Sequence, residues 1–360
     1  MSKDLHGGNI YKFQREGKSN ILDYSSNINP LGVPQKFIDI AKESFNNLVN
    51  YPDPYYIELR EKIAKFNSIK SDDIIVGNGA TEILFLYMRA LKPKKVLILA
   101  PCFAEYERAL KSIEAKIEYF KLEEKDNFYP NILNLKKEIE DNNYDLLLFC
   151  NPNNPTGQFI KLEDIEKIIE SCNKKDTKIF VDEAFIEFVE DWKNKTVCLL
   201  KNKNIFIMRA FTKFFAIPGL RLGYGIIFDD DLKERMLEEK EPWSVNTFAN
   251  LAGLVMLDDK EYIDKSERWI LEEKKFLYNE LSKVENIKVF KGECNFLLIK
   301  LFTFKSNEFR EKMIENNILV RDAANFKFLN ESYIRVAVKD RNSNLKMLES
   351  FKSVIDLNNK

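Results

Sequence analysis

Five short apolar runs constrain the fold of this chain more than any other feature of its sequence. They occupy residues 72–76, 95–100, 144–150, 177–182 and 203–210, and they are rich in Val, Ile, Leu and Phe. Such runs without polar alternation are typical of strands that are buried on both faces, as in a parallel sheet covered by helices. Helix-like segments separate the runs and leave room for βα connections. The sequence therefore predicts an α/β domain built around a mostly parallel sheet.

The last third of the chain has a different pattern. A long charged helical pattern at residues 259–284 is followed by strand-like segments at 286–301 and 331–340. This order of elements predicts a smaller α+β domain. We therefore expect three parts, namely an N-terminal arm at 1–44 that joins the smaller domain, a large domain at 45–245, and a small domain at 246–360.

Composition excludes several classes of function. Apolar residues make up 45% of the chain and charged residues 31%, and the formal net charge is -1. This balance offers no basic surface for nucleic acid or a membrane, and no apolar stretch approaches the ~18 residues of a membrane span. The N-terminus lacks the apolar core of a signal peptide, and the five scattered cysteines are typical of reduced thiols in a cytosol. We expect a cytoplasmic protein that binds neither nucleic acid nor membranes.

A single histidine, His6, narrows the chemistry further. One histidine excludes a His-rich metal site, and it excludes a His-based Ser or Cys triad anywhere away from His6. We expect no metal. Acid–base work must then be done by Lys, Tyr, Asp or Glu side chains.

Polar residues follow four of the apolar runs, at the point where each run ends. They are Gly79, Ala80 and Thr81 after the first run, Asn154 after the third, Asp182 at the end of the fourth and Lys213 after the fifth. Taken singly, each has a structural explanation: the Lys213 stem can lie on apolar surface, Asp182 can cap a helix and Asn154 can form a turn. Ligands of open parallel sheets, however, collect at the carboxyl ends of the strands. The four ends together indicate one site.

The combination of residue types at these ends indicates a cofactor site. A lysine amine, a carboxylate for a pyridinium nitrogen, an amide for a phenolic oxygen and a glycine-rich anion site for a phosphate describe a site for pyridoxal phosphate. The P-loop pattern G-x-x-x-x-G-K-[ST] is absent. Arg221 and Arg335 add two cations, although either could alone be a surface residue or the polar face of a strand.

Ten motifs spread over nearly the whole chain carry a resemblance to a known family. They are LHGGN, LDYSSNINPLGVP, YPDPYY, GNGATE, PCFAEYERAL, NPNNPTGQ, VDEAFIEF, TKFFAIPGLRLGY, PWSVN and VRDAANF. The chain resembles the fold-type-I pyridoxal-phosphate enzymes, in the branch that contains histidinol-phosphate aminotransferases and threonine-phosphate decarboxylases. The HGGN and NINPLG motifs, and Phe185 where the aminotransferases typically have tyrosine, favour the decarboxylases. The resemblance implies a large domain with a mostly parallel seven-stranded sheet between helices, plus a smaller α+β domain.

The resemblance also implies a role for each matching residue around the cofactor. Lys213 would hold pyridoxal 5′-phosphate covalently and then exchange a proton at the substrate Cα, while Asp182 would keep the pyridine nitrogen protonated. Asn154 would donate to O3′, and Phe103 would cover the ring. The cofactor phosphate would be held by Gly79, Ala80, Thr81, Thr212 and Arg221, and by Tyr51 from the second subunit of a homodimer.

The substrate-binding residues follow from the same resemblance. Arg335, with Asn154 beside it, would bind the α-carboxylate through a bidentate pair. A phosphate monoester would be bound by Arg321, with His6, Gly8 and Asn29 closing the site from the N-terminal arm as a lid. Two segments depart from the family. Residues 325–333 differ, and Ala210 replaces a Ser or Thr, which removes a phosphate hydrogen bond worth about 1.5–3 kcal/mol unless Thr81 or water compensates.

The activity that the resemblance implies is decarboxylation of O-phospho-L-threonine to (R)-1-aminopropan-2-yl phosphate and CO2, in cobalamin biosynthesis. The alternative reaction is amino transfer between histidinol phosphate and 2-oxoglutarate, which Lys213, Asp182 and Arg335 would serve equally well. A different class is a cofactor-binding regulator or an inactive homologue, but such a protein would carry a DNA-binding extension or lack Lys213. The expected partners are a small phosphorylated amino acid and a second copy of the chain.

Overall fold

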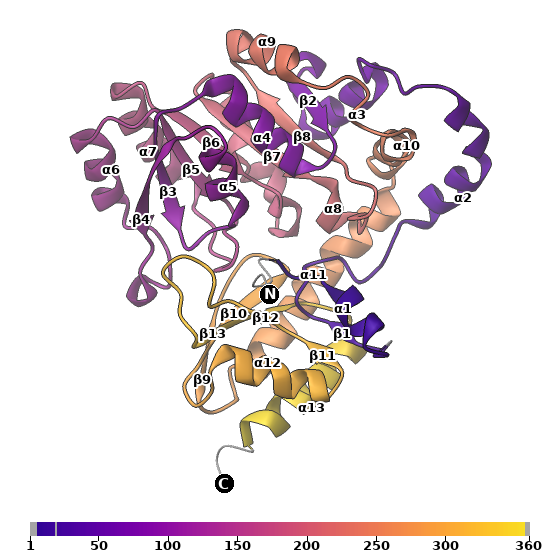
Figure 1. Cartoon of the computed structure of the whole chain (residues 1–360), viewed down its shortest axis with the longest axis vertical. Coiled ribbons are helices and arrows are strands. Elements are labelled where there is room, and N and C mark those ends of the chain that lie inside the picture. Colours follow the sequence, from indigo (N-terminus) through magenta and orange to yellow (C-terminus); the bar gives the residue numbers. More distant parts are fainter. Residues whose placement is uncertain (1–5, 19, 357–360) are drawn as a thin grey trace.

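The central feature of the fold is a seven-stranded sheet with the strand order β2-β8-β7-β6-β5-β3-β4 (Figure 1). The computed structural model describes residues 6–18 and 20–356. The strands of this sheet are β2 (Ile74–Gly77), β3 (Lys95–Ala100), β4 (Lys116–Lys121), β5 (Leu146–Cys150), β6 (Lys178–Asp182), β7 (Ile205–Ala210) and β8 (Gly223–Ile227). Within the sheet, β8 alone runs antiparallel to its neighbours. The predicted α/β fold with a mostly parallel seven-stranded sheet is confirmed.

Alternate residues of the central strands enter two hydrophobic cores, one on each face of the sheet. Leu97 and Val181 belong to one core, whereas Val96 and Phe180 belong to the other. Both faces of each central strand are therefore buried, which explains the apolar runs without alternation. The first core includes residues of α3 (Ile57–Asn67), α6 (Ile132–Asp141), α7 (Leu162–Lys174) and α10 (Thr247–Met256). The second includes residues of α4 (Ala80–Leu91), α5 (Glu105–Lys111) and α9 (Asp230–Glu239).

Two strands of the sheet, β4 and β8, lie outside the five predicted runs. Strand β4 is an edge strand that pairs only with β3 in this sheet, so its sequence KIEYFK keeps charged residues. Strand β8 contains Gly223 and Gly225, and glycine in a sequence usually predicts a turn rather than a strand. A Cβ at Gly223 would lie 2.3 Å from the Ala80 nitrogen, and one at Gly225 would lie 2.3 Å from the Phe206 ring. Close packing of the strand against its neighbours explains both glycines.

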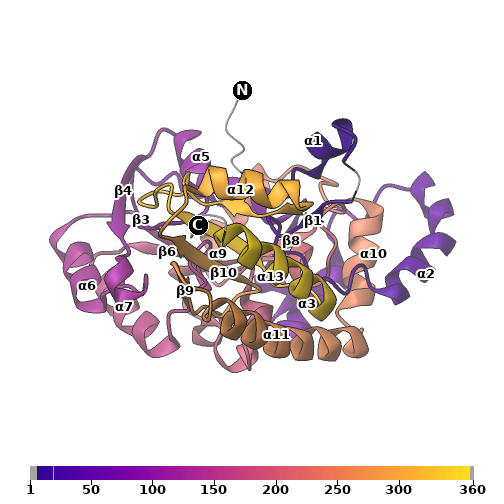
Figure 2. The same ribbon diagram turned by 90° about the horizontal axis from the view of Figure 1, so that it is seen from below.

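A four-stranded antiparallel sheet, β12-β13-β10-β9, forms a second body, shown in the lower half of Figure 1. Its strands are β9 (Ile287–Phe290), β10 (Phe296–Leu301), β12 (Arg321–Asp322) and β13 (Tyr333–Ala337). Seen from below, helices α11 (Lys260–Leu281), α12 (Ser306–Glu315) and α13 (Arg341–Asp356) lie across this body (Figure 2).

The N-terminal segment is attached to the second body. Strand β1 (Leu22–Asp23) pairs in parallel with β11 (Ile318–Leu319), and Phe13 of α1 (Ile10–Arg15) packs with residues of that body. Helix α2 (Gln35–Glu43) then crosses to the upper body, where it packs against α10. The predicted boundaries of the N-terminal arm and the two domains, at residues 45 and 246, remain a proposal.

Three further observations concern the described residues as a whole. None of their helices combines the length and the apolar character that crossing a membrane requires. No three His, Cys, Asp or Glu side chains among residues 6–18 and 20–356 gather into a possible metal site. All five cysteines are buried and free.

Candidate active site

Most of the predicted site residues line one cavity of about 470 Å³. Its walls come from the large sheet, the antiparallel sheet and the N-terminal segment, so it lies where the two bodies of Figure 1 meet. The predicted residues that line it are His6, Ala80, Thr81, Phe103, Asn154, Asp182, Thr212, Lys213, Arg221, Arg321 and Arg335. The fold thus brings together residues that are separated by more than three hundred positions in the chain.

The position of each residue follows from the sheet. Asp182 is the last residue of β6, Asn154 follows β5, and Lys213 lies in the short helix α8 (Phe211–Phe214) directly after β7. Thr81 lies in the first turn of α4, after β2. Since β2, β5, β6 and β7 share one direction, their carboxyl ends meet at one edge of the sheet, as expected for a ligand site.

Two predicted residues of the N-terminal segment lie outside the lining of the cavity. The Gly8 nitrogen donates a hydrogen bond to Ser25 Oγ (2.8 Å). Asn29 is buried, and its side-chain amide donates to Ser266 Oγ (2.7 Å) while its backbone nitrogen donates to the Lys213 carbonyl (3.1 Å). Both residues support neighbouring segments in this structure, and their contact with substrate stays a prediction.

Lys213 is half-buried, and its amine lies in a desolvated, cationic environment. Burial and the nearby guanidinium groups of Arg335 and Arg221 lower the pKa of this lysine to about 8. An amine with such a pKa has a substantial neutral fraction near physiological pH, which a nucleophilic lysine needs. The apolar run around Lys213 therefore creates a desolvated amine rather than a surface lysine.

Asp182 is a buried carboxylate at the bottom of the cavity, with 4% of the residue exposed. Its Oδ1 accepts a hydrogen bond from the Ala184 nitrogen (2.8 Å), and its Oδ2 accepts one from the Tyr106 hydroxyl (2.5 Å). Burial raises the pKa of Asp182 to about 6. A carboxylate in such a place is costly unless a cation meets it, so the site suits a protonated ring nitrogen.

The opposite end of the cavity is built to bind an anion. Helix α4 begins here at Ala80, and no side chain caps its N-terminus, which leaves backbone N–H groups and the positive end of the helix dipole facing the cavity. Gly79, with φ of +81°, lies so close to Arg221 that a Cβ would be 2.4 Å from Nη2. Backbone N–H groups, the Thr81 hydroxyl and a guanidinium at one place suit a phosphate.

Arg335 is a second cation of the cavity, held by neutral groups. Its Nη1 donates to Asn154 Oδ1 (2.5 Å) and its Nη2 donates to the Ser25 carbonyl (2.7 Å), while its Nε is buried without a hydrogen-bond partner. In the described part of the chain, no carboxylate forms an ion pair with Arg335. Burial and Arg321 lower the pKa of the Arg335 side chain, so an anion that entered here would relieve an electrostatic cost.

Arg321 lies opposite Arg335 on the adjacent strand of the antiparallel sheet. The two residues are register partners on β12 and β13, and both are buried. Like charges at such a cross-strand pair destabilise a sheet. Arg321 donates to Asn325 Oδ1 (2.8 Å) and stacks its guanidinium over the Phe326 ring at 5.6 Å. Two buried guanidinium groups side by side indicate a ligand with two anionic groups.

His6 closes the cavity from the N-terminal segment. It does so by contacting Glu105, a residue for which the sequence predicts no role, and Phe103. Its Nε2 lies 2.9 Å from Glu105 Oε1, and its ring packs against Phe103 with the centroids 5.5 Å apart. Glu105 is also 3.4 Å from Arg108 Nη1. Glu105, Arg108 and the neighbouring Tyr106 belong to the motif PCFAEYERAL, so their place in a motif that contains Phe103 is the signal that the sequence offers.

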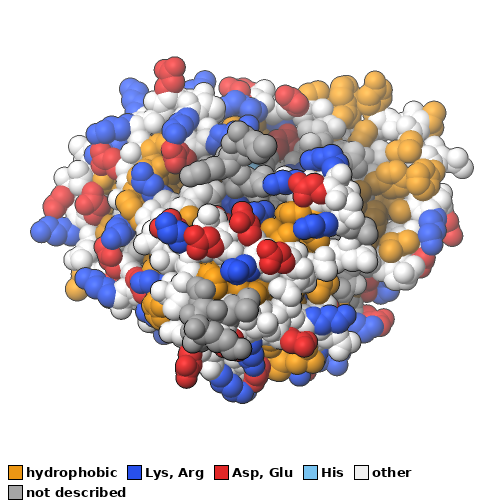
Figure 3. Space-filling view, turned by 60° about the horizontal axis from the view of Figure 1, so that its bottom comes forward, with side chains coloured by type: hydrophobic (Ala, Val, Ile, Leu, Met, Phe, Trp, Pro, Cys, Tyr) orange, Lys and Arg blue, Asp and Glu red, His pale blue; other side chains and the backbone are white. Residues whose placement is uncertain are grey.

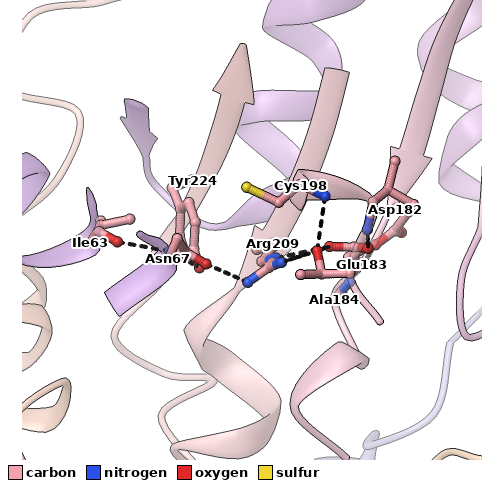
Figure 4. Close-up of polar contacts among 10 residues, drawn as sticks. Ile63, Asn67, Asp182, Glu183, Ala184, Cys198, Arg209 and Tyr224 are labelled. Carbon is pink, nitrogen blue, oxygen red and sulfur yellow. Dashed lines mark hydrogen bonds and ion pairs between the residues drawn. The ribbon is translucent and has the colours of Figure 1, made fainter. Parts of the chain in front are cut away.

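A buried polar network lies behind the end of β6 (Figure 4). Arg209 Nη2 donates to Glu183 Oε2 (2.7 Å), and both side chains are fully buried. Arg209 Nη1 donates to Asn67 Oδ1 (2.5 Å), and Asn67 Nδ2 donates to the Tyr224 hydroxyl (3.2 Å). Breaking one partner of such a buried pair costs about 3–5 kcal/mol. Because Glu183 follows Asp182 directly, the network fixes the backbone that presents the Asp182 carboxylate.

Charge distinguishes this cavity from a second one elsewhere in the molecule. The second cavity, of about 550 Å³, lies between α11 and residues 187–193 and contains none of the predicted residues. Six carboxylates and two lysines line it, whereas five Lys or Arg side chains and two carboxylates line the first. An anionic ligand therefore suits the first cavity, although it is the smaller one.

Tyr51, which we expect to serve a second subunit, lies outside the cavity of its own chain. It is 80% exposed and packs against Trp243, with the ring centroids 4.9 Å apart. Phe45, Leu48 and Val49 are also exposed. Figure 3 shows hydrophobic side chains gathered on the edge of the molecule that carries α2 and α10.

These residues fit pyridoxal phosphate. A desolvated amine, a buried carboxylate that forms no ion pair within 4 Å among the described residues, and an anion site at a helix N-terminus line the same cavity, as the three ends of this cofactor require. Asn154 also lines the cavity, and because its Oδ1 accepts from Arg335, its Nδ2 is the group of this side chain that would donate to a phenolic oxygen.

Comparisons with known proteins match the chain along nearly its whole length. The family model of aminotransferase class I and II matches residues 19–351. A protein of Caldanaerobacter subterraneus subsp. tengcongensis, provisionally named a threonine-phosphate decarboxylase, is 41% identical over 98% of this chain and 94% of its own. The threonine-phosphate decarboxylase of Salmonella typhimurium is 33% identical over 99% of this chain and 98% of its own. The solved histidinol-phosphate aminotransferase of Clostridium acetobutylicum is 35% identical with a TM-score of 0.88, covering 94% of this chain and 100% of that one.

Proposed function

The chain belongs to the aminotransferase class I and II family, and on that premise we propose that it decarboxylates O-phospho-L-threonine to (R)-1-aminopropan-2-yl phosphate and CO2. Its cofactor is pyridoxal 5′-phosphate. The reaction belongs to cobalamin biosynthesis, and the enzyme acts in the cytoplasm. The two relatives named as threonine-phosphate decarboxylases support this choice of substrate.

The observation that carries the proposal is the pair Arg335 and Arg321. The two buried guanidinium groups are register partners on neighbouring strands and line the same cavity. O-phospho-L-threonine has both a carboxylate and a phosphate, so it can offer one anion to each arginine through bidentate hydrogen bonds. Histidinol phosphate has one anionic group, its phosphate, but its co-substrate 2-oxoglutarate has two carboxylates. The arginine pair therefore indicates a ligand with two anions, and the relatives named as threonine-phosphate decarboxylases favour O-phospho-L-threonine.

Each residue then has a defined task in the reaction. When bound, pyridoxal phosphate supplies an electron sink for the pair that stays on Cα after the carboxylate leaves. Asp182 would hold a proton on the pyridine nitrogen, and Asn154 would donate through Nδ2 to the phenolic oxygen. Arg335 and Arg321 hold the two anionic ends of the substrate, and thereby fix which Cα bond is presented for cleavage. Lys213 gives Cα the proton that replaces CO2, for which its pKa of about 8 is suited.

Amino transfer is the second candidate, because the solved structure with 35% identity is named a histidinol-phosphate aminotransferase. Product analysis separates the two reactions. The cofactor-loaded enzyme, supplied with O-phospho-L-threonine and no keto acid, is expected to release aminopropanol phosphate and CO2 over many turnovers, as measured by mass spectrometry. A second assay supplies histidinol phosphate and 2-oxoglutarate and measures glutamate. Glutamate formation in that assay, together with absence of the amine product in the first, would instead establish the aminotransferase.

Uptake of the cofactor should depend on the protonation of Lys213. Attack on the cofactor aldehyde requires the neutral amine, and burial next to Arg335 and Arg221 lowers the pKa of that amine to about 8. The initial rate of borohydride-fixable attachment to the apoenzyme should therefore rise with pH through about 8 and then level. Peptide mapping of the fixed product checks that Lys213 is the modified residue. A rate that is flat over this range would contradict a desolvated amine.

We also propose a homodimer in which Tyr51 of one subunit reaches the cofactor phosphate of the other. The exposed apolar side chains around Tyr51 support it, since a contiguous exposed apolar patch marks an interaction site. Tyr51 cannot serve the cavity of its own chain from its position on Trp243. A second copy placed on this surface would bury the patch and complete the phosphate site.

A charge placed in this patch should break the dimer. Val49 is 86% exposed in the single chain, and Val49→Asp is expected to weaken association at least about tenfold, because burying a valine is worth about 1.5–3 kcal/mol and burying a carboxylate is unfavourable. Sedimentation equilibrium measures the change. Leu133→Asp, at a position that is 80% exposed on α6, is the matched control and should leave association unchanged. A wild-type protein that stays monomeric at micromolar concentration would contradict the proposal.

A further inference from the structure

Tyr106 is a buried tyrosine of α5 whose hydroxyl lies on the carboxylate at the bottom of the cavity. The residue has 0% exposure, and its hydroxyl donates to Asp182 Oδ2 at 2.5 Å. The other carboxylate oxygen, Oδ1, accepts from the Ala184 nitrogen at 2.8 Å. Each oxygen of Asp182 therefore accepts one hydrogen bond from the protein, from different directions, and the orientation of the carboxylate plane is fixed.

The same tyrosine also contacts the aromatic residue expected to cover the cofactor ring. The rings of Tyr106 and Phe103 pack edge to face, with centroids 5.7 Å apart and an interplanar angle of 82°. The residue before Tyr106, Glu105, meets His6 of the N-terminal segment. The first turn of α5 thus joins three parts of the site, and it packs beside α4, whose N-terminus forms the anion site.

We propose that Tyr106 is a positioning residue that keeps Asp182 ionised and aimed for the pyridine nitrogen of the cofactor. The proposal rests on the cofactor assigned above and is independent of which amino acid is the substrate. A short O–H···O⁻ hydrogen bond favours the charged form of a carboxyl group, and it does so most where water is excluded. Among the described residues, Tyr106 supplies such a bond to Asp182 from a side chain.

The surroundings of Asp182 determine the sign of the effect. The ionisable groups that face it are Tyr106 from α5, Cys150 from β5, Glu183 next to β6, Lys213 from α8 and Cys294 before β10. Burial and Glu183 raise the pKa of Asp182, whereas Tyr106 and Lys213 lower it, with a result of about 6. Loss of the Tyr106 hydroxyl should raise this pKa further. A protonated pyridine then binds only after Asp182 loses its proton, so affinity falls at neutral pH and recovers as pH rises.

The test compares Tyr106→Phe with the wild-type protein, using pyridoxamine 5′-phosphate as the probe. This probe has no aldehyde, so the titration of Lys213 as a nucleophile does not enter the measurement. Tyr106→Phe is expected to bind it about 10- to 100-fold more weakly at neutral pH, the scale of a lost hydrogen bond to a charged group. The difference should shrink as the pH becomes alkaline. Tyr87→Phe is the matched control, a buried tyrosine of α4 that faces Asp229 and Arg235, and it should bind as the wild type does.

A double-mutant cycle with Asp182→Asn tests the route of the effect. If Tyr106 acts through the Asp182 charge, Tyr106→Phe should change affinity less than about threefold in the Asp182→Asn background. A loss that is equal at every pH, or that persists in that background, would show a merely structural role and overturn the proposal, as would wild-type affinity in Tyr106→Phe. A wild-type protein that does not bind the probe would overturn the cofactor assignment itself, whereas failure to decarboxylate phosphothreonine would leave the role of Tyr106 standing.

Discussion

Replacement of Lys213 by alanine is expected to lower the rate of product formation by about 10⁴-fold, the upper end of the range for a lost acid–base group. Among the described residues that line the cavity, Lys213 is the sole lysine, so no second amine stands ready to replace it. The variant should still bind pyridoxal phosphate, because Asp182, Arg221 and the N-terminus of α4 are unchanged. Product formation from O-phospho-L-threonine, followed by mass spectrometry, measures the loss.

Two controls separate loss of chemistry from loss of structure. Lys265→Ala removes an exposed lysine of α11 that pairs with Glu261, and it should keep full activity. Equilibrium dialysis of the cofactor should show retained binding by Lys213→Ala. Its thermal unfolding midpoint should not fall, since the substitution removes a desolvated amine that lies near two guanidinium groups. Sustained multiple turnovers by Lys213→Ala would require a different catalytic group and would contradict the assignment.

The central sheet could be predicted from the sequence because burial leaves a local signature. Strands β2, β3, β5, β6 and β7 lie at the five apolar runs, since side chains on both of their faces enter hydrophobic cores. Strand β8 has no such signature, because Gly223 and Gly225 are there for close contacts with Ala80 and Phe206 that arise only in the assembled sheet. A local run of apolar residues therefore indicates a buried strand. Contacts between segments that are distant in the chain leave no such pattern in the sequence.

The same reasoning separates the site residues that were predicted from those that were not. Lys213, Asp182 and Asn154 stand at strand ends, where a polar residue after an apolar run is conspicuous. Tyr106 is one of 14 tyrosines, and only the packing of α5 against the sheet gives its hydroxyl a partner. Arg209 lies within an apolar run, but its pairing with Glu183 depends on the register of β6 and β7. Tertiary partners, rather than residue types, decide these roles.

Arg335 is the position of the second large effect. Arg335→Leu is expected to weaken kcat/KM for O-phospho-L-threonine by roughly 2–5 kcal/mol, the scale for removing one partner of a buried charge pair. Its guanidinium is pre-oriented by Asn154 Oδ1 and the Ser25 carbonyl, and its buried Nε has no partner in the protein, so a donor stands ready for a carboxylate. Steady-state kinetics of the loaded enzyme measures the effect. An unchanged kcat/KM would place the carboxylate elsewhere.

A ligand without the carboxylate distinguishes Arg335 from its cross-strand neighbour. The product, 1-aminopropan-2-yl phosphate, retains the phosphate only, so its inhibition constant should be nearly unchanged by Arg335→Leu and raised by Arg321→Leu. The reverse pattern would exchange the two roles. The thermal stability of Arg335→Leu is a separate readout. The substitution relieves the repulsion between two buried cations, Arg335 and Arg321, but it also removes two hydrogen bonds to neutral groups. These effects oppose each other, so little net change in Tm is expected. A large kinetic loss at constant Tm is therefore the result expected if Arg335 binds the substrate carboxylate rather than stabilises the fold.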